Sequence, residues 1–210
     1  MGIAERKERE KQQRRLEIIQ AAEKVFFSMG LEHATMDDIA AEAELSKGTL
    51  YLYFKNKESL HVEVARRAII LLNGFTREAA EKVDTTVEKL GQMGLATIEF
   101  SRTHPDHMKA IQGLMIKDPG GLELTSGEVQ SIVYGDSSVG MLIQVVEQGM
   151  QDKEIRSDIP APLIAHTLWM QMMSVIQFVN TEQALIEILE LSSEKVFEIH
   201  FELVLNGIKS

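Results

Sequence analysis

The sequence contains no cysteine, which excludes disulfide bonds, thiolate metal sites and a cysteine nucleophile. All four prolines lie at or after Pro105, so the first hundred residues are free to form uninterrupted helices and short turns. No segment combines an alternation of β-branched residues with the turn residues of a hairpin. These absences predict an all-α protein.

Long apolar runs are also missing. None approaches the roughly 20 residues that a helix needs to cross a bilayer. The segment Met1–Arg15 is highly charged and lacks the apolar core of a secretory signal. With 44% apolar and 26% charged residues, the composition is that of an ordinary globular protein. We therefore expect a soluble, cytoplasmic protein that does not enter a membrane.

The net charge of −10 is unevenly distributed. Residues 1–67 contain 12 basic and 12 acidic side chains, whereas the other 143 residues contain 10 and 20. Binding to nucleic acid depends on a local basic surface more than on the total charge. If the chain binds a duplex, the charge distribution indicates that its N-terminal part faces it.

Hydrophobic spacing predicts four helices in the first part of the chain. The first runs over Lys11–Met29 and ends at Gly30. A second, about two turns long, begins at Thr35, whose hydroxyl can accept from first-turn amides. Ser46 can cap a third helix that extends to Phe54. After a break, a long helix runs from Lys57 to about residue 83.

The hydrophobic spacing in the rest of the sequence predicts further amphipathic helices. A loop is expected at residues 118–127, and residues 180–192 stay unassigned. The helices lie at roughly 84–103, 105–117, 126–152, 161–179 and 193–206.

Two short helices joined by a tight turn, after a longer helix, are typical of a helix-turn-helix. Leu50 and Phe54 supply the inner face of the third helix, and Leu45 fills the turn. The outward-facing residues, which we expect to enter a DNA groove, are Lys47, Gly48, Thr49, Tyr51 and Tyr53. The residues suited to hold the phosphate backbone are Thr35, Ser46, Lys55 and Lys57.

The spacing and types of the residues leave two questions open. Spacing alone fits a structural helical hairpin with incidental tyrosines as well as it fits a DNA reader. The basic residues before the first predicted helix could form an arm in an adjacent groove, but interspersed glutamates favour a solvated helix start. The basic residues are Lys7, Arg9, Lys11, Arg14 and Arg15, and the glutamates are Glu5, Glu8 and Glu10.

A resemblance decides between the two readings. The run T-M-D-D-I-A-A-E-A-E-L-S-K-G-T-L-Y-L-Y-F-K-N-K-E-S-L, preceded by I-I-Q-A-A-E-K-V-F-F-S-M-G, closely resembles the DNA-binding domain of the TetR family of bacterial repressors. The resemblance covers about residues 14–62 and is most specific from Ser46 to Glu58. It implies that the outward-facing residues named above lie on the recognition helix, and that Thr35, Ser46 and Lys57 hold phosphates.

The resemblance also implies the overall organisation. Residues 1–56 would form a three-helix DNA-binding head, and residues 57–210 a larger helical domain for ligand binding and dimerisation. A homodimer built on the last two long helices would place two recognition helices on a palindromic operator in double-stranded DNA. The apolar residues expected there are Ile164, Leu168, Met172, Val175 and Val179, with Val196, Phe197, Ile199, Leu203 and Val204.

Methionines in the second domain suggest an adaptable cavity for an apolar or aromatic effector, although methionine is also ordinary core filler. The candidate ligand-binding residues are Phe100, Met115, Tyr134, Met141, His166, Trp169, Met170, Met173 and Phe178. His104 and His107, with Asp106 and Asp118 nearby, permit a metal site by spacing. A helix start with solvent-facing histidines is favoured, so we expect neither a metal nor a cofactor.

Three hypotheses follow for the function. The first is a repressor that leaves its operator when a small molecule binds the second domain and moves the helix starting at Lys57. The second is an enzyme, for which the sequence offers no Ser/His/Asp motif, glycine-rich phosphate loop or H-E-x-x-H. The third is an adaptor whose tyrosine face meets another protein. The first is favoured, and we expect no enzymatic activity.

Overall fold

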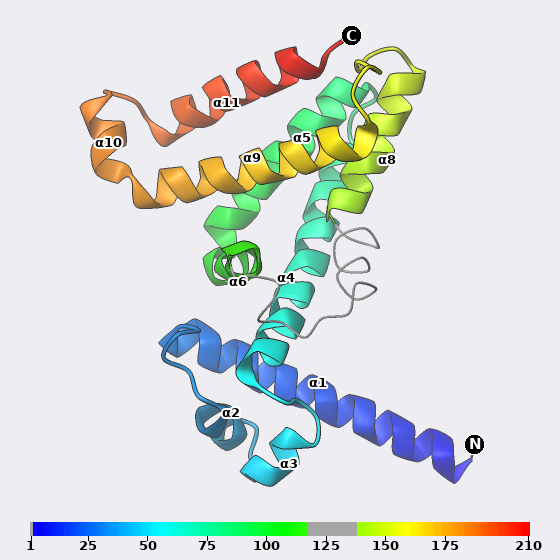
Figure 1. Cartoon of the computed structure of the whole chain (residues 1–210), viewed down its shortest axis with the longest axis vertical. Helices are drawn as coiled ribbons and strands as arrows, with labels where there is room; N and C mark the ends of the chain where they lie inside the picture. The colour runs from blue at the N-terminus through cyan, green and yellow to red at the C-terminus, as the bar shows by residue number, and fades with distance from the viewer. Residues whose placement is uncertain (1, 117–137) are drawn as a thin grey trace. The chain divides into compact units, whose positions relative to one another are not determined.

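The computed structural model describes residues 2–116 and 138–210, and the all-α prediction is confirmed (Figure 1). Within these residues, backbone pairing outside helices and turns is limited to an isolated bridge between Ile155 and Lys209. The helices are α1 (Ile3–Met29), α2 (Met36–Glu42), α3 (Lys47–Tyr51), α4 (Lys57–Ala80), α5 (Thr86–Thr103), α6 (Pro105–Ile116), α8 (Ser138–Gln151), α9 (Ala161–Thr181), α10 (Gln183–Ile188) and α11 (Ser193–Ile208).

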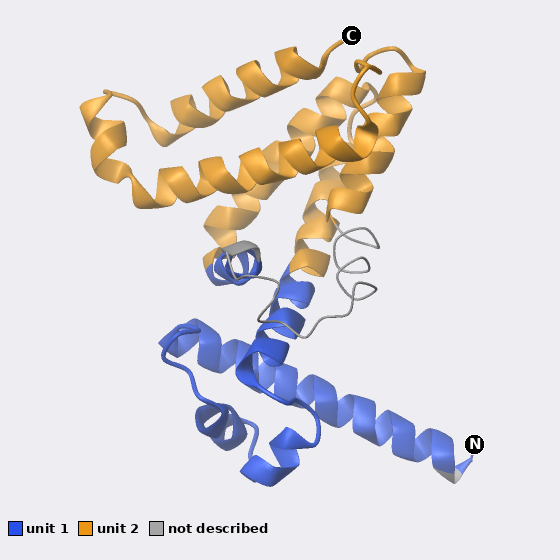
Figure 2. Cartoon of the chain, viewed as in Figure 1, with its two compact units in different colours: residues 1–68, 106–123 blue, residues 69–105, 124–210 orange. Residues whose placement is uncertain are grey.

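The chain forms two compact units, shown in different colours in Figure 2. Unit 1 comprises residues 1–68 and 106–123, and unit 2 comprises residues 69–105 and 124–210. Helix α4 therefore contributes its first half to unit 1 and its second half to unit 2. Helix α6 belongs to unit 1 almost entirely, although it follows α5 of unit 2 in the chain.

Unit 1 is held by one apolar core that all of its helices share. Ile18 and Ile19 of α1 are buried against Ile39 of α2, and Leu50 of α3 is completely buried. Phe54 closes the same core, as predicted from its spacing to Leu50. The core also includes Val25, Phe26, Leu60, Val64 and Ala110.

The ends of α1 and α2 follow the predicted signals. Gly30 has φ +81°, a left-handed conformation that suits glycine, and its N–H donates to the carbonyl of Phe26 at 2.9 Å. Thr35 precedes α2 and accepts from the N–H of Asp38 at 3.2 Å. The Asp38 carboxylate in turn accepts from the Thr35 N–H at 3.0 Å, which completes a reciprocal cap.

Helix α1 begins at Ile3, eight residues earlier than its spacing indicated. Its first turns are exposed and carry ion pairs at helical spacing, such as Arg6 with Glu10 at 2.8 Å. Apolar spacing does not reveal these first turns, because they carry alternating charges and no apolar stripe.

Arg15 does not take part in a free basic arm. Its guanidinium contacts the Glu63 carboxylate at 2.7 Å and lies 5.0 Å from the centre of the Phe54 ring. An ion pair and a cation–π contact therefore tie α1 to α4 and to the end of the helix-turn-helix.

Unit 2 has its own core between α5, α8 and α9. Leu90, Val146, Ile155 and Ile164 are buried together. Gly94 is required on α5, because an added Cβ would lie 2.3 Å from the Phe201 ring of α11. The absence of a side chain at this position lets α11 pack closely on α5.

The apolar stripe predicted for a dimer interface on α9 packs mostly within the chain. Ile164, Met172 and Val179 are buried in unit 2. A different face of α9 exposes Leu163 and Met170. Ile164, Met172 and Val179 are therefore not accessible to a partner. Each face of α9 carries apolar residues, and spacing does not tell which face the protomer uses, so which residues of α9 meet a second copy stays a prediction.

The remaining helix bounds agree with the sequence within a few residues, except that α10 occupies part of the unassigned segment 180–192. The loop predicted at residues 118–127 and the start of the helix predicted at 126 lie outside the described residues. In the parts that the structure covers, no helix combines the length and apolarity that a membrane span requires.

Candidate nucleic-acid interface and effector cavity

The turn between α2 and α3 has the geometry of a helix-turn-helix. Glu44 adopts φ +53°, and the N–H of Leu45 donates to the carbonyl of Ala40 at 2.9 Å. Leu45 is half-buried against the core of unit 1, as predicted for the residue that fills the turn. The turn redirects the chain so that α3 starts immediately after α2 and shares its core.

Helix α3 is shorter than predicted. It spans Lys47–Tyr51, and the Ser46 hydroxyl caps it by accepting from the N–H of Thr49 at 3.1 Å. After Tyr51 the chain tightens, with the N–H of Leu52 donating to the Thr49 carbonyl. The tightening turns the following side chains away from the directions of a continuous helix.

The change of direction separates the two tyrosines. Tyr51 is 45% exposed on α3, as predicted. Tyr53 is only partly exposed and packs against the core of unit 1, so it does not project outward as expected. Lys47 and Gly48 are exposed and Thr49 is half-buried.

Leu52, which the sequence prediction omitted, is 81% exposed. The helical spacing of Leu50 and Phe54 does not assign Leu52 to either face, so the sequence carries no signal for this exposure. Because Leu52 directly follows Tyr51, the two residues together place an aromatic ring and a branched apolar side chain on the outside of the helix-turn-helix.

Lys47 has an acidic partner within unit 1. Its ammonium lies 2.7 Å from a carboxylate oxygen of Asp37, at the start of α2. The hydrogen bond to Asp37, reinforced by the attraction between opposite charges, raises the pKa of Lys47. Lys47 therefore stays charged at neutral pH, but its charge is partly compensated in the absence of DNA.

Gly48 has no internal reason to be glycine. An added Cβ would meet only the Ser46 hydroxyl, at 3.9 Å, and φ of Gly48 lies outside the left-handed range. Glycine costs helix stability relative to alanine. Because no internal contact requires glycine here, its missing side chain leaves bare backbone on the outward face of α3.

Lys57 has a structural role that the sequence did not reveal. Its ammonium donates to the carbonyl oxygens of Leu31 at 2.8 Å and Ala34 at 2.9 Å. A third, longer bond reaches the carbonyl of Glu32 at 3.3 Å. The side chain predicted to hold a phosphate thus holds the segment between α1 and α2, whereas Lys55 is exposed.

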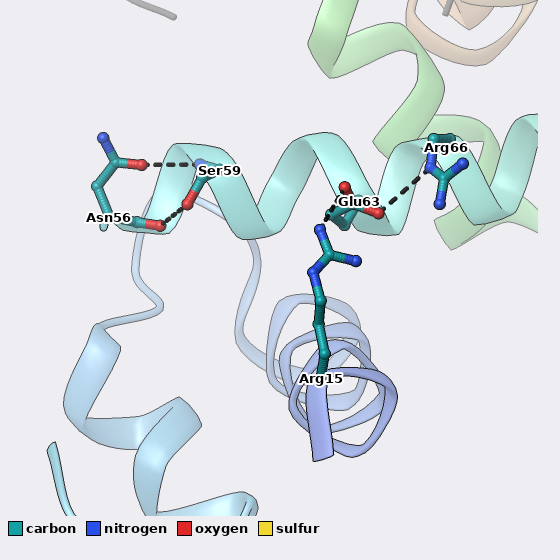
Figure 3. A network of polar contacts seen from close by, with 5 residues as sticks. All are labelled: Arg15, Asn56, Ser59, Glu63 and Arg66. Atoms are coloured by element: carbon teal, nitrogen blue, oxygen red, sulfur yellow. Dashed lines mark hydrogen bonds and ion pairs between the residues drawn. The ribbon is translucent and has the colours of Figure 1, made fainter. Parts of the chain in front are cut away.

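Figure 3 shows the start of α4 and the ion pairs that hold it. The side-chain oxygen of Asn56 accepts from the N–H of Ser59 at 2.8 Å, which caps the helix. Further along, Glu63 contacts Arg15 of α1 and also accepts from Arg66 at 3.2 Å. These bonds fix the direction of α4 within unit 1.

Unit 2 contains a small cavity of about 50 Å³. Helices α4, α5, α8, α9 and α11 line it. The lining residues are Thr76, Leu90, Met93, Gly94, Thr97, Ser138, Leu142, Leu168, Trp169, Met172, His200, Phe201, Val204 and Leu205.

Of the nine predicted ligand-binding residues, Trp169 lines this cavity. Met170 is exposed and Met173 is buried elsewhere, because successive residues of a helix point in directions about 100° apart. Phe100 is buried against Phe75 and His104. Met141, His166 and Phe178 are half-buried outside the lining. The side chain of Met115 and the whole of Tyr134 lie outside the described residues.

The histidines considered as metal ligands have other neighbours. His104 stacks on Phe100 with ring centres 4.9 Å apart. His107, in unit 1, contacts the Phe27 ring and lies 3.6 Å from a carboxylate oxygen of Glu23. Asp118 lies outside the described residues. Elsewhere, the described side chains include no group of three or more acidic or histidine residues arranged to hold a metal.

The capped helix-turn-helix of unit 1, joined to a helical second unit, defines a helix-turn-helix DNA-binding transcriptional regulator. Residues 18–64 match the model of the bacterial regulatory proteins of the tetR family. This part of the chain therefore carries a DNA-binding domain of the TetR family, as the resemblance of its helix-turn-helix predicted.

Curated relatives include proteins named as regulators. The chain is 35% identical over 95 residues to the HTH-type regulator YhgD of Bacillus subtilis, covering 45% of this chain and half of that protein. It is 27% identical over 155 residues to the fatty acid metabolism regulator protein of Bacillus subtilis, covering 74% and 77%. The HTH-type repressor KstR2 of Mycolicibacterium smegmatis is 27% identical over 158 residues, with 72% of each chain covered.

Solved structures share the fold. A tetR family transcription regulator from Shewanella sp. PV-4 superposes with a TM-score of 0.70 at 19% identity, covering 94% of this chain and 98% of that one. FadR from Bacillus subtilis, solved in complex with stearoyl-CoA, gives a TM-score of 0.68 at 20% identity, covering 92% and 98%.

Proposed function

We propose that this regulator is a repressor that binds a palindromic operator as a homodimer and leaves it when an apolar small molecule binds unit 2. The observation that carries the proposal is the exposed surface of α3, where Lys47, Gly48, Tyr51 and Leu52 face outward from a rigidly capped turn. Relatives named as a repressor and as a fatty acid metabolism regulator support the direction of control and the apolar effector.

The proposed division of labour follows the sequence. Residues 1–56 would bind DNA, with α3 in the major groove and with Thr35, Ser46 and Lys55 near phosphates. The groove residues would be Lys47, Gly48, Thr49 and Tyr51, together with Leu52, while Tyr53 supports them from the core side. Lys57 would contribute its backbone N–H to a phosphate, because its ammonium is engaged with carbonyl oxygens.

Residues 57–210 would bind the effector and form the dimer. Four large apolar side chains are exposed on α9 and α11, which pack together in unit 2: Leu163, Met170, Ile199 and Leu203. Exposed apolar residues that gather on neighbouring helices favour burial against a second copy. A dimer would give the two recognition helices the symmetry of a palindrome.

Selection of bound sequences from random duplex DNA tests the proposal. A palindromic motif supports a dimeric operator reader, and failure to enrich any sequence contradicts it. The replacements Lys47→Ala and Tyr51→Ala should weaken binding to the selected operator. Lys24→Ala is the matched control, because Lys24 forms a similar exposed ion pair, with Glu42 at 2.9 Å, but lies on α1.

The dimer and the switch need separate measurements. Sedimentation of the full chain should give a dimer, and Leu203→Glu should shift it toward monomer by placing like charges in the interface. Operator release is then followed while apolar compounds are added. A compound that binds the chain but leaves operator affinity unchanged would contradict the switch and leave the DNA reader intact.

A further inference from the structure

The cavity of unit 2 combines an apolar wall with three hydroxyl groups. Thr76 of α4, Thr97 of α5 and Ser138 of α8 each line it and are almost completely buried. They come from three different helices, whereas most other lining residues are aliphatic or aromatic. Buried hydroxyl groups must satisfy their hydrogen bonds inside the protein or with a ligand.

Two of these hydroxyl groups have committed their protons to the protein. Thr97 donates to the backbone carbonyl of Met93 at 2.8 Å. Ser138 donates to the side-chain carbonyl of Asn73 at 2.5 Å. A hydroxyl has one proton and two acceptor lone pairs, so each oxygen can meet a ligand only as an acceptor.

Thr76 is in the same situation. Its hydroxyl donates within α4, to the carbonyl oxygens of Leu72 at 3.2 Å and of Asn73 at 3.3 Å. Asn73 thus accepts from Thr76 through its backbone and from Ser138 through its side chain. The shared partner holds these two acceptor oxygens on neighbouring parts of the cavity wall.

The charge of the lining points to the same kind of ligand. Among the residues that the structure places around the cavity, His200 is the titratable one. Burial lowers the pKa of His200, so its imidazole is neutral at neutral pH. A ligand carboxylate would therefore meet no cation among these lining residues, after losing its hydration.

We infer that this cavity binds an uncharged, largely apolar molecule that carries an O–H or N–H donor, with the donor placed on the hydroxyl oxygens of Thr76, Ser138 or Thr97. The inference rests on the proposed function, because it takes this cavity as the effector site of the regulator. The open volume of about 50 Å³ is smaller than a typical ligand site. Met93 and Met172 supply flexible side chains that can move aside.

A pair of isomeric probes tests whether an O–H donor on the ligand strengthens binding. Hexanol and methyl pentyl ether have the same atoms, but only the alcohol has an O–H. A cavity without acceptors favours the ether, since the alcohol gives up a hydrogen bond to water. Acceptors on the wall reverse that order, and we expect hexanol to bind about fivefold more tightly than the ether. Hexanoate should bind more weakly than both at neutral pH.

Binding can be followed through Trp169, which lines the cavity and is the sole tryptophan of the chain. In Thr76→Val/Thr97→Val/Ser138→Ala, which removes all three hydroxyl groups and nearly preserves the shape of the two threonine side chains, the preference for the alcohol should vanish or reverse. Ser101→Ala is the matched control, because Ser101 is a buried α5 residue that donates to the carbonyl of Ile98 and lies outside the lining. It should keep the preference.

Three results would overturn the inference. They are no fluorescence response to hexanol, equal or tighter binding of the ether or hexanoate, and an alcohol preference that persists in the triple variant. Operator binding is measured on the same proteins without a probe. Absence of operator binding by the unaltered protein would contradict the proposed regulatory function and leave the ligand inference standing. Operator binding by the unaltered protein without any alcohol preference would contradict only this inference.

Discussion

The ammonium of Lys57 donates a hydrogen bond to the carbonyl oxygen of Ala34 at 2.9 Å, and so ties the start of α4 to the segment before α2. The same ammonium also reaches Leu31 and Glu32. A cation that satisfies several carbonyl oxygens at once stabilises a turn that has few backbone partners of its own. The side chain of Lys57 therefore stabilises the fold of unit 1.

Replacement of Lys57 by methionine should lower the free energy of unfolding by about 1–3 kcal/mol, because carbonyl oxygens are left without their charged donor. Urea unfolding followed by circular dichroism measures this change. Lys55→Met is the control, since Lys55 is exposed and should cost little. Unchanged stability of Lys57→Met, combined with a smaller salt dependence of operator binding, would indicate a phosphate contact by the side chain instead.

Asp37→Asn should strengthen operator binding by about two- to fivefold. The change removes the carboxylate that lies 2.7 Å from Lys47 and leaves the lysine charge available for phosphate. Titration of labelled operator at several salt concentrations is the measurement. Glu42→Gln, which releases Lys24 in the same way on α1, should leave the affinity unchanged. Equal gains from both variants would show a general charge effect.

Gly48→Ala should leave the protein as stable as before, or up to about 1 kcal/mol more stable, because alanine favours helix and the new Cβ meets only Ser46 at 3.9 Å. Operator affinity should nevertheless fall by about tenfold, since a methyl group would stand between α3 and the groove wall. Thermal unfolding and operator titration are read side by side. Unchanged affinity would place Gly48 outside the interface.

Leu52→Ala should weaken operator binding by about fourfold wherever Leu52 contacts a thymine methyl group. Replacing thymine by uracil in the selected operator removes that methyl group. Wild-type protein should lose affinity when uracil replaces thymine at particular positions. The Leu52→Ala variant should lose no further affinity from the same replacement. Leu16→Ala, an exposed leucine of α1, serves as the control. Additive losses from the variant and from uracil would mean that the two groups do not touch.

The cap between Thr35 and Asp38 should give stability a defined pH dependence. Hydrogen bonds from the Thr35 hydroxyl and backbone N–H lower the pKa of Asp38. The unfolded chain thus binds a proton at higher pH than the folded one, so the contribution is complete above the unfolded pKa and is lost as pH falls through the folded pKa. Wild type should exceed Asp38→Asn in stability at neutral pH, and the difference should shrink in acid.

The sequence by itself determined the helical class, the helix-turn-helix and the TetR-family type of its DNA-binding domain. Gly30, Thr35 and Ser46 act through their own backbone or over three residues, so their effects are visible in a linear pattern. Leu50 and Phe54 could be assigned to the core for the same reason, since one turn of helix separates them. Local hydrogen bonds and helical spacing require no knowledge of distant contacts.

The tertiary structure decided which side chains are exposed or engaged in contacts within the chain. Lys57 is engaged with carbonyl oxygens 23–26 residues earlier in the chain, and Arg15 pairs with Glu63 across 48 residues. Tyr53 is less exposed than expected, and Leu52 faces outward, because α3 ends early. In unit 2, where each face of α9 carries apolar residues, only the packing of α5, α8 and α11 separates core from cavity and surface. Burial depends on contacts between distant segments, which the order of residues along one helix does not contain.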